Sequence, residues 1–273
     1  MKPKLLYITD LHYQSKGRVY YEEDMYLSSQ LSKHFDLVLC DPRVAINFMT
    51  DFDVILFRNT GPVLYFQDKY EDFKKQAIAT EAKVFNELSG KADMLGKQYL
   101  VDLSRKNYPV IPSINKNDEI HRLPQAERYL VKPLKGADSI DIELISAIEL
   151  EKFNFTDKLV QPVMDFSYEV SFYFINREFQ YALYAPETNK RWNLERYDVI
   201  EADVKYAQRF IDWNAINYGI QRIDACRMPN GELFLMEIED LNPYLSLDLL
   251  SEQPRNDFVS NLVKALKEYV NQT

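Results

Sequence analysis

Several oxygen-bearing side chains gather in one short stretch of this sequence. The segment LFLMEIEDLNPY, residues 233–244, begins as an apolar strand and then places Glu237, Glu239 and Asp240 within four positions, with Asn242 just beyond. Carboxylates this close together either form cross-strand ion pairs on a solvated strand face or bind a cation. Mg²⁺ prefers carboxylates together with phosphate oxygens, so the second alternative would indicate metal-assisted phosphate chemistry.

A β-hairpin is predicted to position these acids. Two β-patterned runs flank Asn230-Gly231 in IQRIDACRMPNGELFLMEIED, and Asn-Gly is the strongest short hairpin signal. A two-residue loop, or a four-residue loop centred on the same bond, pairs Asp224 with Glu237 and Arg222 with Glu239.

Strand alternation then separates two faces of the hairpin. The apolar residues predict the core face: Ile223, Ala225, Phe234, Met236 and Ile238. The other face carries Arg222 with Asp224, Glu237 and Glu239. Asp240 has the opposite parity and is expected outside this cluster. At an effective dielectric near 20, two like charges ~4 Å apart cost on the order of 4 kcal/mol. One arginine cannot cancel three acids, and a divalent cation would.

Composition limits the other function classes. The chain has 273 residues, 46% of them hydrophobic, which is ample for a core in one large or two to three small domains. The formal net charge is −9 and the basic residues are scattered, so nucleic-acid binding is disfavoured. The sequence shows no secretory signal and no apolar run of the ~20 residues that span a membrane. Cys40 and Cys226 lie far apart, which favours a reducing cytoplasmic setting.

The chain order predicts an α/β protein with α+β subdomains. Strands alternate with helices over residues 1–88, which predicts a parallel sheet with crossover helices. Ligands of such sheets lie beyond the carboxyl ends of the strands, where Arg58, Asn59 and Thr60 occur. Residues 89–165 read as a small α+β subdomain. Residues 166–273 begin with antiparallel strands, include the acidic hairpin and end in an amphipathic helix.

A nucleotide would need a site other than the common glycine-rich ones. There is no GxGxxG or GxxxxGK[ST] pattern among only seven glycines. Lys132 ends the apolar strand YLVKP before LKGADS, where Gly136 permits a tight turn, and Lys97 lies early in a predicted helix, LGKQYLVDL. The strand LVQPVM offers backbone groups that could read an adenine, and Glu169 follows as a candidate acceptor for ribose hydroxyls.

These pieces, in this order, resemble the ATP-grasp enzymes. The chain shows a lysine on a helix, VKPLKGADS, a QPV hinge followed by a glutamate, and RID followed thirteen residues later by EIE. The last pattern is similar to that of D-alanine–D-alanine ligases. The stretches DVILFRNTGP and YALYAPETNKRWNL resemble bacterial glutathione synthetases and the ribosomal-protein glutamate ligases. The resemblance runs from about residue 50 to residue 250 and implies an ATP-grasp fold behind an N-terminal parallel-sheet unit.

The resemblance also implies roles for single residues. Lys97 and Lys132 would hold the phosphates of ATP, with Gly136 and Ser139 in the loop that covers them. Gln161 and Val163 would contact the adenine and Glu169 the ribose. Asp224 and Glu237 would bind Mg²⁺ (or Mn²⁺), with Glu239 or Asn242 as the third ligand. Arg222 would steady the transferred phosphoryl group. Arg191 and Asn193 would stabilise the acyl phosphate or the bound carboxylate, which Arg58, Asn59 and Thr60 would grip.

This chain departs from the family pattern at two places. The family ends its metal motif as E-x-N, whereas this chain has Glu237-Ile238-Glu239, which adds a negative charge. Its phosphate-covering loop is richer in glycine than KGADSID, where the Ser139 hydroxyl could compensate.

The implied reaction is amide formation from a carboxylate and an amine. ATP would phosphorylate the carboxylate of a small amino-acid-like or peptide substrate, and the amine would attack the acyl phosphate. Such chemistry needs positioning and charge stabilisation rather than a protein nucleophile. Two alternatives are a kinase on the same fold and a nucleotide-binding protein without catalysis. The family also contains many homodimers and homotetramers, so a homo-oligomer is an open expectation.

Overall fold

The N-terminal unit is built on a parallel sheet with a helix on each face. The computed structural model describes residues 1–15, 18–136, 141–187, 190 and 193–272. The strand order is β4-β1-β5-β6, and the bounds are β1 (Lys4–Ile8), β4 (Asp36–Cys40), β5 (Val54–Phe57) and β6 (Val84–Phe85). Both β1 and β5 are almost entirely buried and apolar, as is typical of parallel strands covered on two sides.

Two helices cover this sheet. Leu27 and Leu31 of α1 (Tyr20–Leu31) share a core with Leu5 and Tyr7, whereas α2 (Gln67–Ala79) packs on the opposite face, around Ile8. A small ribbon of β2 (Gln14–Ser15) and β3 (Arg18–Val19) precedes α1. The parallel sheet predicted for this part of the chain is confirmed.

A three-stranded antiparallel sheet forms the central unit. Its order is β8-β7-β9, with β7 (Arg128–Pro133), β8 (Glu143–Ser146) and β9 (Lys158–Pro162). The short helix α4 (Ala147–Leu150) starts with a capping box of Ser146 and Glu149. Helix α3 (Gln98–Arg105) joins this unit to the C-terminal sheet, because Leu100 and Leu103 share a core with residues of that sheet.

The C-terminal unit is a five-stranded antiparallel sheet in the order β12-β11-β10-β13-β14. Its strands are β10 (Tyr168–Ile175), β11 (Glu178–Ala185), β12 (Glu195–Arg196), β13 (Ile220–Arg227) and β14 (Leu233–Glu239). Helix α5 (Glu201–Asn214) packs Phe210 and Ile211 against one face of this sheet. The short 3₁₀ helices are η1 (Ala45–Asn47), η2 (Met49–Asp51), η3 (Val63–Phe66), η4 (Asn117–Arg122) and η5 (Leu247–Leu249).

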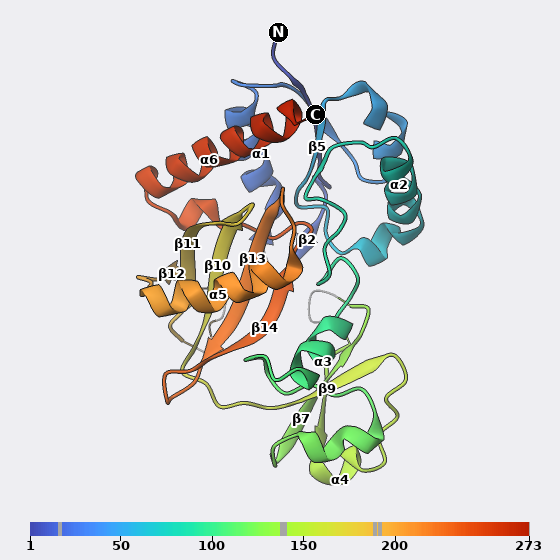
Figure 1. Cartoon of the computed structure of the whole chain (residues 1–273), viewed down its shortest axis with the longest axis vertical. Helices are drawn as coiled ribbons and strands as arrows, with labels where there is room; N and C mark the ends of the chain where they lie inside the picture. The colour runs from blue at the N-terminus through green and yellow to red at the C-terminus, as the bar shows by residue number, and fades with distance from the viewer. Residues whose placement is uncertain (16–17, 137–140, 188–189, 191–192, 273) are drawn as a thin grey trace.

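The last helix returns to the beginning of the chain. Figure 1 shows α6 (Glu252–Asn271) lying across α1 at the N-terminal end of the molecule. Phe258 and Leu262 of α6 share one core with Leu5 of β1 and with Tyr173 of β10. The segment predicted as a C-terminal subdomain therefore contributes its final helix to the core of the N-terminal unit. Among the described residues, no helix has both the length and the apolar character needed to span a membrane.

Candidate active site

One large cavity lies where the three units meet. It has a volume of about 610 Å³ and is lined by residues of the N-terminal unit, of β7 and of the C-terminal sheet. Strand alternation explains which side chains reach it. In β10, Phe172 and Phe174 pack toward α5, so Glu169, Ser171 and Tyr173 point the other way, into the cavity.

The pairing predicted for the acidic residues is confirmed. Asp224 lies opposite Glu237, and Arg222 lies opposite Glu239. All four line the cavity. Strand β13 thus delivers an arginine and an acid, and the facing strand β14 delivers two acids to the same site.

The core face of β14 differs from the predicted one because the strand contains a β-bulge. Near the turn, Arg227 pairs with Leu233 and Gly231 adopts a positive φ of +89°, so the strands leave the turn one residue out of the expected register. A bulge between Asp224 and Ala225 restores that register further along. Leu235 consequently occupies the core. Phe234 and Met236, expected there, are only partly buried, and Met236 lines the cavity.

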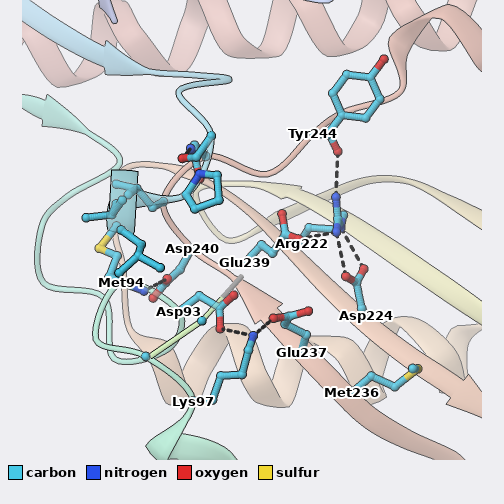
Figure 2. Close-up of a pocket in the computed structure, with 18 of the residues that line it drawn as sticks. Asp93, Met94, Lys97, Arg222, Asp224, Met236, Glu237, Glu239, Asp240 and Tyr244 are labelled. Carbon is cyan, nitrogen blue, oxygen red and sulfur yellow. Dashed lines mark hydrogen bonds and ion pairs between the residues drawn. The ribbon is translucent and has the colours of Figure 1, made fainter. Parts of the chain in front are cut away.

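The three carboxylates form a compact cluster of possible metal ligands. One oxygen from each of Asp224, Glu237 and Glu239 lies within 4.8 Å of the other two. Arg222 bridges two of them: its Nη2 lies 2.8 Å from Asp224 Oδ2 and 2.5 Å from Glu239 Oε1 (Figure 2). Ser171, which sequence reasoning missed, donates its hydroxyl to Asp224 Oδ1 at 2.7 Å. Hard, closely spaced carboxylate oxygens of this kind fit a divalent cation such as Mg²⁺.

Lys97 belongs to this cluster rather than to a helix interior. The helix predicted around it begins only at Gln98, because Gly96, with φ +95°, interrupts the helical pattern. The Lys97 ammonium forms an ion pair with Glu237 and lies 3.6 Å from Asp93 Oδ1 (Figure 2). The cluster therefore contains a second cation, and a fourth acid, that the hairpin pattern alone did not reveal.

The pKa values of Glu237 and Glu239 are shifted in opposite directions. Burial raises the pKa of Glu237, but the Lys97 charge and hydrogen bond outweigh it and lower the pKa to about 2. Burial and the negative charges of Asp224 and Glu237 raise the pKa of Glu239 to about 7, against the opposing effect of Arg222. Burial and the charge of Glu237 also raise the pKa of Asp93. The acids thus exceed the cations around them, and a bound divalent cation would relieve that excess.

Asp240 has a different role from its neighbours. Its carboxylate is buried and accepts hydrogen bonds from the backbone N–H groups of Ala92 (3.0 Å) and Met94 (2.9 Å) and from Asn214 Nδ2 (3.2 Å). Burial raises its pKa to about 6. Asp240 therefore fixes the segment that carries Asp93 and Lys97. Its side chain points away from the carboxylate cluster, as its opposite parity predicted.

The residues predicted to hold ATP divide into two groups. Lys97, Lys132, Gly136 and Glu169 line the cavity. A Cβ added to Gly136 would lie 2.7 Å from Pro133 Cγ, so close packing favours glycine here. Gln161 and Val163 do not line the cavity: the Gln161 side chain is buried and donates to Ser113 Oγ, and the Val163 N–H donates to the Arg128 carbonyl. The Gln161 side chain and the Val163 N–H are therefore engaged within the protein, and the predicted contacts of these two residues with an adenine stay predictions.

The residues predicted to bind the substrate carboxylate also differ in whether they reach the cavity. Asn59 lines the cavity, whereas Arg58 and Thr60 lie behind its wall. Arg58 is completely buried and donates to Glu23 and to the Pro243 carbonyl, because its strand end is covered by the segment that follows β14. Thr60 accepts a hydrogen bond from Asn242 Nδ2 at 2.7 Å. This bond occupies the amide nitrogen of Asn242, which itself lines the cavity.

Of the residues predicted to stabilise the acyl phosphate, the structure describes only Asn193. Its side chain is exposed, its N–H donates to the Lys190 carbonyl, and it does not line the cavity, although Leu194 does. Arg191 and Ser139 lie outside the described residues, and their predicted roles stay predictions.

Solved structures provide the comparison that the sequence alone does not. No protein-family model matches the sequence, and a search of curated proteins finds no match. The D-cycloserine synthetase DcsG superposes with a TM-score of 0.73 at 17% identity, covering 98% of this chain and 99% of that one. The D-alanine–D-alanine ligase from Bacillus anthracis complexed with ATP gives 0.67 at 14%, covering 98% and 97%. The ATP-grasp ligase PsnB complexed with minimal precursor gives 0.66 at 13%, covering 98% and 100%. The chain therefore has the ATP-grasp fold.

Proposed function

We propose that this protein is an ATP- and Mg²⁺-dependent carboxylate–amine ligase. It joins a small amino-acid-like or peptide carboxylate to an amine through an acyl phosphate. One observation carries the proposal: Asp224, Glu237 and Glu239 share a cavity with Arg222 in a chain of ATP-grasp fold. Similarity of fold to ligases and synthetases supports the reaction class, and the free thiols Cys40 and Cys226 accord with a reducing cytoplasmic setting.

The site residues divide into binding and charge-stabilising groups. Asp224, Glu237 and Glu239, or Asn242 in place of Glu239, would hold Mg²⁺, which when bound offsets the negative charge of the phosphates. Lys97 and Lys132 would contact the phosphates, and Glu169 the ribose. Arg222, held by Asp224 and Glu239, presents a fixed positive charge where the phosphoryl group would be transferred. Asn59 and Arg191 would orient the carboxylate.

A two-substrate assay tests the proposal. Purified protein with Mg-ATP is screened against amino acids and dipeptides, and phosphate release, ADP and the mass of the product are measured. We expect phosphate release that requires both an acid and an amine, with an amide product. A stable phosphorylated product formed from one substrate would instead identify a kinase. Mg-ATP binding without turnover by any mixture would support a non-catalytic nucleotide-binding protein.

A further inference from the structure

The end of the cavity nearest the N-terminal unit is aromatic. Tyr13 follows β1, Tyr20 opens α1 and Tyr244 follows β14, and all three line the cavity. The ring centroids of Tyr13 and Tyr20 lie 4.9 Å apart, and those of Tyr20 and Tyr244 lie 4.7 Å apart in an edge-to-face arrangement. These three side chains, called the aromatic wall below, form one continuous surface from two distant parts of the chain.

The aromatic wall is held by backbone contacts that leave little room for movement. A Cβ added to Gly61 would lie 2.6 Å from the Tyr13 ring, and Gly61 has a φ of +69°. Asn242 Nδ2 donates to Thr60 Oγ1 at 2.7 Å and to the Gly61 carbonyl at 3.2 Å, which ties the Tyr13 side of the wall to the strand that carries the acids. A preorganised wall of this kind favours a ligand group of matching shape.

The surroundings of the aromatic wall favour a neutral group over a charged one. Pro62, Val63 and Leu64 continue the apolar lining. Among the described side chains that line the cavity with Pro62, Val63 and Leu64, Glu71 and Lys74 carry charge, and they pair with each other at 3.0 Å. A substrate ammonium would need an acid with spare charge, whereas tyrosine rings offer faces and edges on which an uncharged aromatic ring can stack.

The wall also begins beside the proposed reaction centre. The Tyr244 carbonyl accepts a hydrogen bond from Arg222 Nη1 at 3.1 Å, and the same guanidinium holds Asp224 and Glu239 (Figure 2). The Tyr244 ring points away from Arg222, toward the rest of the wall, so a carboxylate beside Arg222 would reach the tyrosines with a side group that extends along the cavity. A substrate that fills both ends of the cavity would be an acid with an apolar ring close to its carboxyl group.

We infer that the aromatic wall makes this protein selective for a carboxylate substrate that carries an aromatic side group. The inference rests on the proposed ligase function for the identity of the reacting group. Recognition itself follows from the cavity, so binding can be measured without turnover.

Binding of matched amino acids tests this inference. Both enantiomers of phenylalanine, cyclohexylalanine, alanine and glutamate are titrated by calorimetry, with Mg²⁺ alone and with Mg²⁺ and a non-hydrolysable ATP analogue. We expect a phenylalanine enantiomer to bind at least about tenfold more tightly than alanine, glutamate or cyclohexylalanine, since pocket contacts of one side group discriminate by roughly 10–200-fold. Lack of any such preference in both conditions would overturn the inference.

Two neighbouring tyrosines supply the variant and its control. Tyr20→Leu removes a ring of the wall, whereas Tyr21→Leu removes its exposed neighbour on α1, which does not line the cavity. We expect Tyr20→Leu to abolish the preference for phenylalanine and Tyr21→Leu to retain it, with matching melting temperatures as the test of folding. Tyr20→Phe, which keeps the ring, should retain the preference. A preference that survives Tyr20→Leu would overturn the assignment.

The outcomes separate this inference from the proposed function. Aromatic-selective binding without ATP-dependent ligation would contradict the function and leave the selectivity in place. Ligation restricted to small or charged acids would contradict the selectivity and leave the ligase function in place.

Discussion

The two ends of the cavity are built in opposite ways. The acidic end, formed by Arg222, Asp224, Glu237 and Glu239, comes from one hairpin whose strands pair directly. The aromatic wall joins Tyr13 and Tyr20, near the start of the chain, to Tyr244, which meets them only in the folded protein. Charge dominates the first and shape the second. Changes at the acidic end should therefore alter chemistry, whereas changes at the aromatic wall should alter which molecule is accepted.

A buried polar cluster connects these two ends. The Glu23 carboxylate accepts hydrogen bonds from the backbone N–H groups of Leu245 (3.1 Å) and Leu247 (3.2 Å), and Arg58 lies 3.3 Å away. Arg58 also donates to the Pro243 carbonyl at 2.8 Å. These contacts fix the segment that presents Tyr244, which belongs to the wall through its ring and to the acidic end through its carbonyl. The buried Arg58 thus stabilises this segment from the inside, and its predicted contact with the substrate stays a prediction.

The largest effect is expected from neutralising the acidic end. Asp224→Asn removes a charge that Arg222 and a bound cation would share, while Ser171 can still donate to the amide oxygen. Loss of several kcal/mol of charge stabilisation corresponds to a fall in turnover of at least about a thousandfold. The measurement is phosphate release at saturating Mg-ATP. Glu232→Gln, an exposed acid beside the turn of the same hairpin, is the control and should retain activity. Near wild-type activity in Asp224→Asn would refute the metal assignment.

Removing the Lys97 ammonium should lower the free energy of unfolding. Lys97→Met leaves Glu237 and Asp93 without their partner, and breaking a buried pair of this kind costs about 3 kcal/mol. Urea unfolding measures the loss. Lys91→Met, which removes an exposed hydrogen bond to the Trp213 carbonyl, should change stability little.

Mg²⁺ makes this experiment specific for a cation site. Added Mg²⁺ should restore part of the stability of Lys97→Met, because a ligand that binds only the folded state stabilises it. If Mg²⁺ changes the unfolding of neither the variant nor the unmodified protein, the carboxylate cluster is a structural ion-pair network instead.

A smaller, pH-dependent effect should arise from Glu239. Its pKa is about 7 in the folded protein and 4.5 ordinarily, so the folded state binds the additional proton between these values. Its contribution to stability is fully present below pH 4.5 and is lost as the pH rises to 7, at up to about 1 kcal/mol per pH unit. Unfolding measured in EDTA should show this slope, and Glu239→Gln should reduce it. A slope should remain in this variant, because burial also raises the pKa of Asp240, to about 6, and the pKa values of Asp93, Glu23 and Asp24.

Glu237 should act in a separate pH window. Its pKa of about 2 lies below the ordinary 4.5, so its contribution is present above pH 4.5 and is lost on acidification toward pH 2. An identical slope above pH 4.5 in Glu239→Gln and in the unmodified protein would contradict the assignment of the raised pKa to Glu239.

The contrast between the two ends also explains how much the sequence could predict. Strand pairing is local, so Asn230-Gly231 and the alternation of side chains predicted Asp224 opposite Glu237, although this pairing holds only because a bulge restores the register that the turn shifts by one residue. The bulge was not predictable from alternation, because Met236 is itself the extra, unpaired residue between Leu235 and Glu237 and so does not take the predicted place in the core. The parallel and antiparallel units followed from the order of strand and helix patterns.

Contacts between distant segments could not be predicted from the sequence. Nothing near Lys97 indicates that its ammonium meets Glu237 on another unit, and nothing near Arg58 indicates that Pro243 and Glu23 enclose it. The aromatic wall was missed for the same reason, since Tyr13 and Tyr20 resemble ordinary surface or core tyrosines until Tyr244 is placed beside them. Long-range packing decides such sites, and a single sequence records only their separate parts.

Two glycines provide the finest test of the aromatic wall. Gly61 and Gly231 both adopt positive φ, +69° and +89°, so alanine at either position carries a backbone cost of about 1 kcal/mol. They differ in surroundings: a Cβ at Gly61 would collide with the Tyr13 ring, whereas a Cβ at Gly231 meets nothing within 4 Å. Both variants should therefore lose some stability in urea unfolding, but only Gly61→Ala should weaken the binding of phenylalanine, by a few-fold. Because Gly231 lies in the turn of the acidic hairpin, equal losses of binding would mean that general destabilisation, rather than the position of Tyr13, controls recognition. A loss confined to Gly61→Ala would instead show that the shape of the wall is set independently of the acids.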